Sequence, residues 1–137
     1  MKQLGVYIIY NGNCEEALNF YVSALGGEIG EINRYSEMPQ PVADENKNLV
    51  MHASYKNGDL VIMASDTTPE QPSVIGTNIQ LSLDFDSDEA MEAAFNNLQA
   101  GGKVTMPLQD TFWGSKFGML EDKFGINWMF SLPKEQA

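Results

Sequence analysis

The stretch "LQDTFWGSKFGMLEDKFGINWMF", residues 108–130, holds three aromatic–glycine pairs close together in the sequence. They are Trp113-Gly114, Phe117-Gly118 and Phe124-Gly125. A glycine beside a ring suits a point where the chain turns tightly, or where it passes close to a ligand or another backbone. Two interpretations therefore stay open: hairpin corners that carry core aromatics, or bends whose rings line a cavity.

The stretch closes a longer segment that begins with "TNIQLSLDF", residues 77–85. Apolar and polar residues alternate there, which predicts a strand with one apolar face and one polar face. The apolar face comprises Ile79, Leu81, Leu83 and Phe85, and the polar face comprises Asn78, Gln80, Ser82 and Asp84. Asp86 and Glu89 then have capping-box spacing and open a helical stripe that Gly101-Gly102 ends. Further strands are predicted over 103–109, 115–121 and 126–132.

An earlier segment shows the same order of signals. "LGVYIIY" predicts a strand, Asn13 and Glu16 have capping-box spacing, and a helical stripe follows until Gly26-Gly27. Strands are predicted over about 28–35, 48–56 and 59–65. The sequence thus predicts an α+β protein of two βαβββ modules, about 1–66 and 77–132, within one domain spanning 1–137. The proline-bearing stretch 36–48 predicts a long loop that is either a functional lid or simply mobile.

Composition narrows the function classes. The chain has 137 residues, 43% of them hydrophobic, which is typical of an ordinary globular domain. Nineteen acidic against eight basic residues give a net charge of −11, which argues against nucleic acid or an anionic membrane as partner. One cysteine, Cys14, excludes an internal disulfide and a cysteine-cluster zinc site, and its position on the helical stripe predicts a packed thiol. The apolar run near the N-terminus is too short for a signal or a membrane span, so we expect a cytoplasmic protein.

Three segments together resemble the PhnB-like branch of the vicinal oxygen chelate superfamily, which contains glyoxalase I, bleomycin-resistance proteins and extradiol dioxygenases. They are "YNGNCEEALNFYVSALGGEI", "MHASYKNGDLVIMASD" and the block from Ile79 to Phe130, of which Gly101–Phe130 is the most specific part. The resemblance implies the glyoxalase/bleomycin-resistance/dihydroxybiphenyl dioxygenase fold, in which the two modules form a cup-shaped half-open barrel. It also implies a homodimer.

Metal-dependent members of that superfamily hold a divalent ion with His, Glu or Gln side chains from four strands. By the resemblance, those positions fall on Asn78, Met63, Met129 and a residue near Val6, with a shift of one possible at the last. A valine cannot bind a metal, an amide offers one weak oxygen, and thioethers are poor ligands for hard cations. We therefore expect no metal and no other cofactor, with adaptable methionines in the former metal position.

The candidate ligand-binding residues are His52, Met63, Asn78, Gln80, Gln109, Trp113, Phe117 and Met129. His52, the sole histidine, is either a structural hydrogen-bonded residue, a polar contact to a ligand, or a catalytic base or metal ligand. Trp113 and Phe117 either line a pocket, where a flat or apolar molecule stacks on their rings, or they close the barrel edge or form a dimer contact. Phe124 and Trp128 are expected in the core.

Three functions compete on these grounds. The leading hypothesis is a metal-independent, homodimeric protein that binds a small organic molecule without changing it. The rival is a lyase, isomerase or dioxygenase that uses a relocated metal or His52. The third is a closed fold that serves only as a dimeric interaction module. Family membership does not decide among the three, because this scaffold hosts unrelated chemistries.

Overall fold

The computed structural model describes residues 1–133, and the chain divides into two compact units, Met1–Val74 and a second that begins at Ile75. No helix within residues 1–133 is both long enough and apolar enough to cross a membrane.

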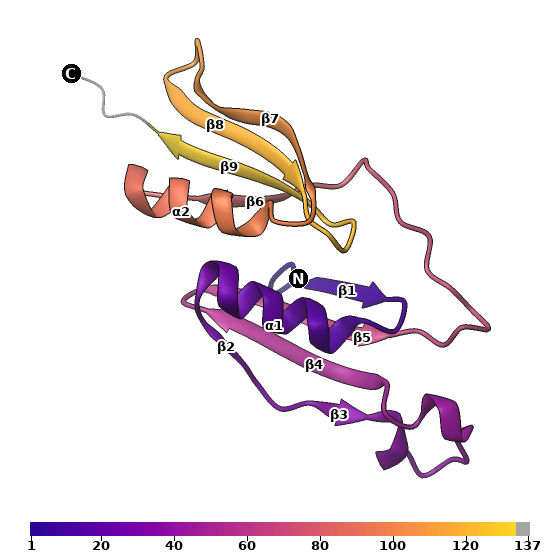
Figure 1. Cartoon of the computed structure of the whole chain (residues 1–137). Coiled ribbons are helices and arrows are strands. Elements are labelled where there is room, and N and C mark those ends of the chain that lie inside the picture. The colour runs from indigo at the N-terminus through magenta and orange to yellow at the C-terminus, as the bar shows by residue number, and fades with distance from the viewer. Residues whose placement is uncertain (134–137) are drawn as a thin grey trace. The chain divides into compact units, whose positions relative to one another are not determined.

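The first unit is a sheet with one helix across one face (Figure 1). Its elements are β1 (Val6–Tyr10), α1 (Cys14–Leu25), β2 (Glu28–Ile29), β3 (Asn33–Arg34), β4 (Val50–Asn57) and β5 (Leu60–Asp66). The strand order is β1-β5-β4-β2, with β3 also paired to β4. β1 runs parallel to β5, whereas β4 pairs antiparallel with β5, β2 and β3.

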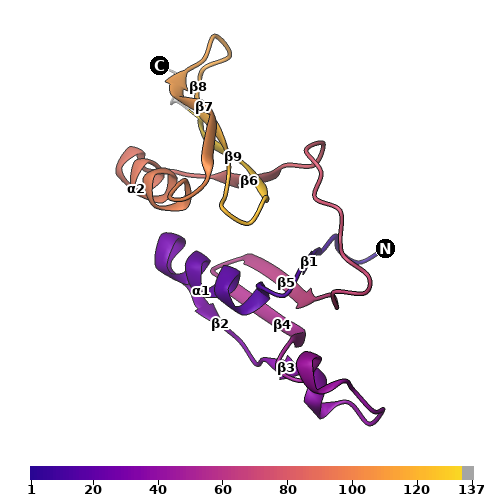
Figure 2. The ribbon, with the colours of Figure 1, turned by 45° about the vertical axis from the view of Figure 1, so that its right-hand side comes forward.

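The second unit repeats this plan. Its elements are β6 (Leu81–Asp84), α2 (Asp88–Leu98), β7 (Lys103–Asp110), β8 (Ser115–Glu121) and β9 (Asn127–Pro133), in the order β6-β9-β8-β7. β6 and β9 are parallel and the other pairs antiparallel. The β7–β8 hairpin extends beyond the rest of its sheet (Figure 2). The predicted α+β class and its two βαβββ modules are confirmed.

The helix starts differ from the predicted capping boxes. Asn13 precedes α1 but its side chain caps no backbone N–H. The amide of Cys14 instead donates to Oδ1 of Asp66, at the end of β5, at 2.8 Å. At α2 the cap is Ser87, not Asp86, and its hydroxyl accepts from the amide of Ala90 at 3.3 Å. At α1 a residue distant in sequence thus bonds the first helical amide, and at α2 the cap lies one residue later than expected.

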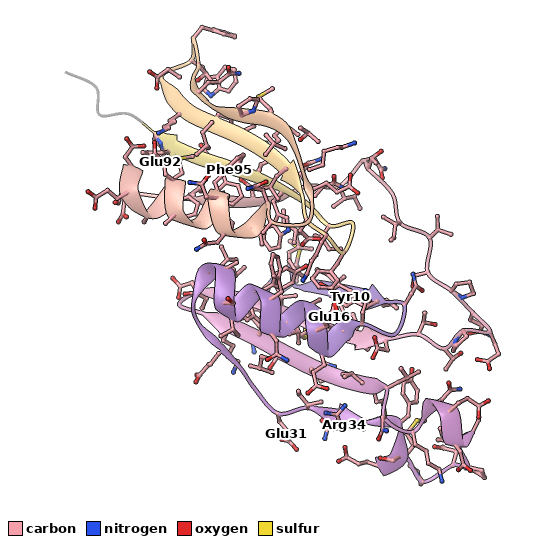
Figure 3. All side chains as sticks on the ribbon, viewed as in Figure 1. Tyr10, Glu16, Glu31, Arg34, Glu92 and Phe95 are labelled. Carbon is pink, nitrogen blue, oxygen red and sulfur yellow. The ribbon has the colours of Figure 1, made fainter. Side chains whose placement is uncertain are left out.

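Each unit has its own core between its helix and its sheet. In the first, Leu18 and Tyr21 of α1 are buried, as are Tyr55, Ile62 and Ala64 of the sheet. In the second, the buried residues include Met91, Phe95, Leu98, Leu120, Trp128 and Phe130. Phe95, on the side of α2 that faces the sheet (Figure 3), meets Phe130 edge to face with ring centroids 5.1 Å apart. The prediction that Phe124 and Trp128 lie in the core is confirmed.

The three aromatic–glycine pairs do two different jobs. Gly114 and Gly125 adopt φ of 86° and 87°, so each provides a left-handed turn that other residues disfavour. Gly118 lies within β8, where a Cβ would come 2.8 Å from the Leu108 side chain and 3.1 Å from the Phe95 ring. That glycine therefore lets the strand lie close beneath α2.

The 36–48 loop is fastened to the first unit at several points. The guanidinium of Arg34 donates to the carbonyl of Asn48 at 2.8 Å and to the carboxylate of Glu15, on α1, at 2.9 Å. The Tyr35 hydroxyl donates to the carbonyl of Asp66 at 2.8 Å, and Asn46 is buried. Two short 3₁₀ turns, Tyr35–Glu37 and Asp44–Asn46, lie within this fastened segment.

Candidate functional site

Each sheet has one face turned away from its own helix, and these two faces carry most of the predicted site residues. We call them the α1-distal face, with Tyr7, Ile9, His52, Ser54 and Met63, and the α2-distal face, with Ser82, Asp84, Met106, Gln109, Phe117, Met119, Met129 and Ser131. Membership follows from strand alternation, because the intervening residues such as Ile62 and Phe130 are buried on the helix side.

Two rows of side chains cross the α2-distal face. One row joins Met106, Met119, Met129 and Ser82 on four adjacent strands. The other joins Gln109, Phe117, Ser131 and Asp84. Thioethers and an aromatic ring, all partly exposed, therefore form the centre of this face, with polar groups at its two edges. Methionine is flexible and polarisable, so such a surface can adapt to differently shaped apolar molecules.

Trp113 extends this apolar surface at the tip of the β7–β8 hairpin. Its ring meets Phe117 edge to face, with centroids 5.7 Å apart, while 56% of the residue stays exposed. Phe112 packs against Trp113 in turn, at 5.1 Å, and is itself 98% exposed. The structure thus brings together four predicted residues: Gln109, Trp113, Phe117 and Met129.

Asn78 and Gln80 lie outside the strands, in the segment just before β6. The predicted strand over 77–85 is therefore too long, and Ile79, expected on its apolar face, is 74% exposed. Asn78 is exposed, whereas Gln80 is partly buried. Within residues 1–133, Oε1 of Gln80 is a buried oxygen with no hydrogen-bond partner.

The α1-distal face holds the other two predicted residues, His52 and Met63. Met63 lies opposite Tyr7 on one side and Ser54 on the other, so the three form a row across β1, β5 and β4. His52 lies two residues from Ser54 on the same side of β4. Its Nδ1 is 3.3 Å from the Tyr7 hydroxyl oxygen, and the centroids of the two rings are 5.7 Å apart.

The positions assigned to a metal do not fit one. Val6 lies opposite the buried Ile62 and so points to the helix side, whereas its neighbour Tyr7 lies opposite Met63. The phenol of Tyr7, the thioethers of Met63 and Met129 and the amide of Asn78 are each poor donors for a hard divalent cation. Among residues 1–133 there is also no group of three His, Cys, Asp or Glu side chains placed to hold a metal.

Comparison with known proteins identifies the family. The family model of the Glyoxalase/Bleomycin resistance protein/Dioxygenase superfamily matches residues 3–130. The chain belongs to this superfamily. Within it, the chain is PhnB-like: it is 27% identical to the PhnB protein of Bacillus cereus, whose structure superposes with a TM-score of 0.76 over 96% of this chain and 99% of that one.

Two other proteins are more similar to this chain in sequence. Protein PA1353 from Pseudomonas aeruginosa is 39% identical and has a TM-score of 0.87, covering 98% of this chain and 100% of that one. Protein YjdN from Escherichia coli K12 is 33% identical over an alignment of 143 positions that covers 97% of each chain. The similarity therefore extends over both modules.

Most residues of these faces are absent from the predicted ligand-binding set, and Tyr7, Met106 and Met119 are the aromatic and thioether residues among them. Tyr7, the partner of His52, was passed over because the first-strand position was placed on its neighbour. Met106 and Met119 were missed although Met119 follows Phe117 by two residues in a strand, which places both side chains on one face. That alternation was the available signal for Met119. The place of Met106 on this face depends on a register shift in β7, which no sequence pattern predicts.

Proposed function

We propose that this superfamily member binds a small organic molecule without the superfamily's metal and without changing it chemically. The observation that carries the proposal is the α2-distal face. Its centre consists of partly exposed methionines and Phe117, with Trp113 beside them. Apolar, deformable surface with polar groups at its margin is what small-molecule sites generally present.

The polar margin supports a ligand of mixed character. Gln109 lies opposite Phe117 at one end of its row, and Ser131 and Asp84 continue that row at the other end. An amide, a hydroxyl and a carboxylate can orient a molecule whose apolar part contacts the ring and the thioethers. We therefore propose a flat or apolar ligand that carries a polar substituent.

A fluorescent probe tests the apolar part of this proposal. We expect 8-anilinonaphthalene-1-sulfonate to bind the folded protein and Phe117→Ala to weaken that binding by roughly fivefold or more, the effect of removing a central aromatic contact. Ile79→Ala is the matched control, because it removes an exposed apolar side chain of the same unit that lies outside the sheet. Equal losses in both variants, or no binding, would refute the site.

Metal content is tested separately. Elemental analysis with native mass spectrometry of the purified protein reports metal, co-purified ligand and oligomeric state together. We propose a metal-free homodimer in the cytoplasm; the dimer rests on family membership alone. Stoichiometric divalent metal that is lost with His52→Ala would overturn the metal-free binder, as would turnover of a glutathione thiohemiacetal or a catechol that this variant abolishes.

A further inference from the structure

The hydrogen bond between Tyr7 and His52 leaves one imidazole nitrogen available. The Tyr7 hydroxyl lies 3.3 Å from Nδ1 of the imidazole, a distance at which Nδ1 of a neutral imidazole can accept the phenolic proton. A neutral imidazole that accepts at Nδ1 carries its proton on Nε2. His52 then presents a donor, Nε2–H, on the side of the ring away from Tyr7.

The second imidazole nitrogen has no hydrogen-bond partner within residues 1–133 and is reachable from solvent. Among residues 1–133, Tyr7 is the hydrogen-bond partner of the imidazole. His52 is partly exposed. Within the described residues, Oε1 of Gln80 is the buried side-chain atom that lacks a partner; Nε2 of His52 also lacks one but is not buried, so it is open to solvent. An accessible N–H of fixed direction is a ready donor for a ligand's acceptor atom.

Neighbouring groups add a second donor and an apolar floor. Ser54 lies on the same side of β4 as His52. It is part of the row of Tyr7, Met63 and Ser54, in which Met63 lies between the other two. Gly30 faces the serine closely: a Cβ there would come 2.6 Å from the Ser54 hydroxyl, so the glycine leaves that hydroxyl its room. Two donors therefore lie beside a thioether and a phenol ring.

We infer that His52 Nε2–H and the Ser54 hydroxyl form a subsite for a carboxylate or carbonyl oxygen of a small organic molecule, and that Tyr7 is the positioning residue that fixes the imidazole. Both groups are donors toward the ligand, which selects an acceptor oxygen and disfavours an ammonium group. The subsite consists of first-unit residues alone, so its failure leaves the proposal for the α2-distal face untouched.

Because the chain has one histidine, nitrogen NMR of the imidazole gives an unambiguous test. In protein labelled with ¹⁵N-histidine, the spectrum is expected to show the Nε2–H tautomer. Sodium benzoate should shift the Nε2–H signal saturably, whereas benzylamine, which has the same ring but a cationic donor, should not. The Nδ1–H tautomer, no saturable benzoate shift, or an equal response to both probes would each overturn the inference.

Two variants separate positioning from folding. Tyr7→Phe keeps the ring and removes the hydroxyl, so it should admit the Nδ1–H tautomer and weaken benzoate binding roughly fivefold, about the effect of one neutral hydrogen bond. Tyr35→Phe is the control, since it removes a hydroxyl of the same unit that donates to the Asp66 carbonyl instead. Matched far-UV circular dichroism verifies the fold. An unchanged tautomer and affinity in Tyr7→Phe, or equal changes in Tyr35→Phe, would exclude the positioning role.

Discussion

The indole Nε1 of Trp128 donates a hydrogen bond to Oδ2 of Asp122 at 2.9 Å, inside the second unit. The other carboxylate oxygen accepts from the amides of Phe124 and Ile126 at 2.8 and 3.1 Å. One buried side chain thus holds the β8–β9 turn and fixes the largest core residue of that unit. Asp122 therefore has a structural role in the second unit.

Replacing that carboxylate should therefore destabilise the protein. In Asp122→Asn the amide group turns a donor toward either the indole or the two backbone amides, which leaves at least one buried donor unpaired. We expect a loss of roughly 2–3 kcal/mol in the free energy of unfolding, measured by urea denaturation. The adjacent Glu121→Gln should stay within about 0.5 kcal/mol of the parent. Equal effects in the two variants would show that the hydrogen bonds of Asp122 contribute little.

Glycines that follow the helices give a second prediction. A Cβ on Gly102 would overlap the carbonyl oxygen of Glu121, and one on Gly27 would overlap that of Lys56, so in both units the chain passes against a strand backbone. Backbone atoms cannot move aside cheaply, and Gly102→Ala should destabilise by more than about 2 kcal/mol. Gly58→Ala is the comparison: it has a φ of 60° but no atom within 4 Å, so we expect about 1 kcal/mol. Thermal or urea unfolding measures both, and a Gly102→Ala loss no greater than that of Gly58→Ala would contradict the close approach.

The thiol of Cys14 predicts a pH dependence. Burial, followed by the charges of Asp66 and Glu15, raises the pKa of this thiol from 9.0 to about 12. The folded protein keeps the proton to higher pH than the unfolded chain does, so this contribution to stability is full below pH 9.0 and is lost as pH rises toward about 12. Burial also raises the pKa of Tyr35 and of Tyr55, which act in the same direction.

Cys14→Ala should accordingly make the decline in stability between pH 9 and 12 shallower without abolishing it. The measurement is the urea midpoint at several pH values, compared as a slope because the variant also loses core volume. A slope identical to that of the parent would mean that the thiol does not contribute.

Arg34 anchors the long loop, and its removal should free that loop. Arg34→Ala loses the hydrogen bonds to the Asn48 carbonyl and to Glu15, so hydrogen exchange in residues 35–49 should become faster while β4 and β5 stay protected. Lys47→Ala is the control from the same segment, because the Lys47–Asp44 ion pair is largely exposed and such pairs stabilise little. Comparable exchange in the two variants would show that Arg34 does not hold the loop.

The sequence predicted the helices and most strands because their patterns are local. It failed where the structure depends on a partner strand. The alternation of 77–85 suits a strand throughout, yet β6 pairs only from Leu81, which lies opposite Trp128 near the start of β9. The segment before β9 forms a turn over residues 122–126, so it offers residues 77–80 no strand with which to pair. Only the length of a neighbouring strand fixes such a boundary.

The candidate site was predicted in part for the same reason. His52, Met63, Phe117 and Met129 lie on helix-distal faces because alternation within a strand decides a face. Which side chains become neighbours depends on register, and a shift of one residue exchanges Val6 for Tyr7. Asn13 does not cap α1, and the acceptor at the start of that helix is Asp66, which is distant in sequence.

The row of Met106, Met119 and Met129 makes the α2-distal face susceptible to oxidation. Peroxide or hypochlorite adds oxygen to accessible thioethers, and each sulfoxide replaces an apolar, flexible group with a polar, chiral one. Oxidation there would weaken the affinity for an apolar ligand, while Met91, a buried residue of α2, would stay intact. Recovery would then depend on the two reductases that each repair one sulfoxide epimer.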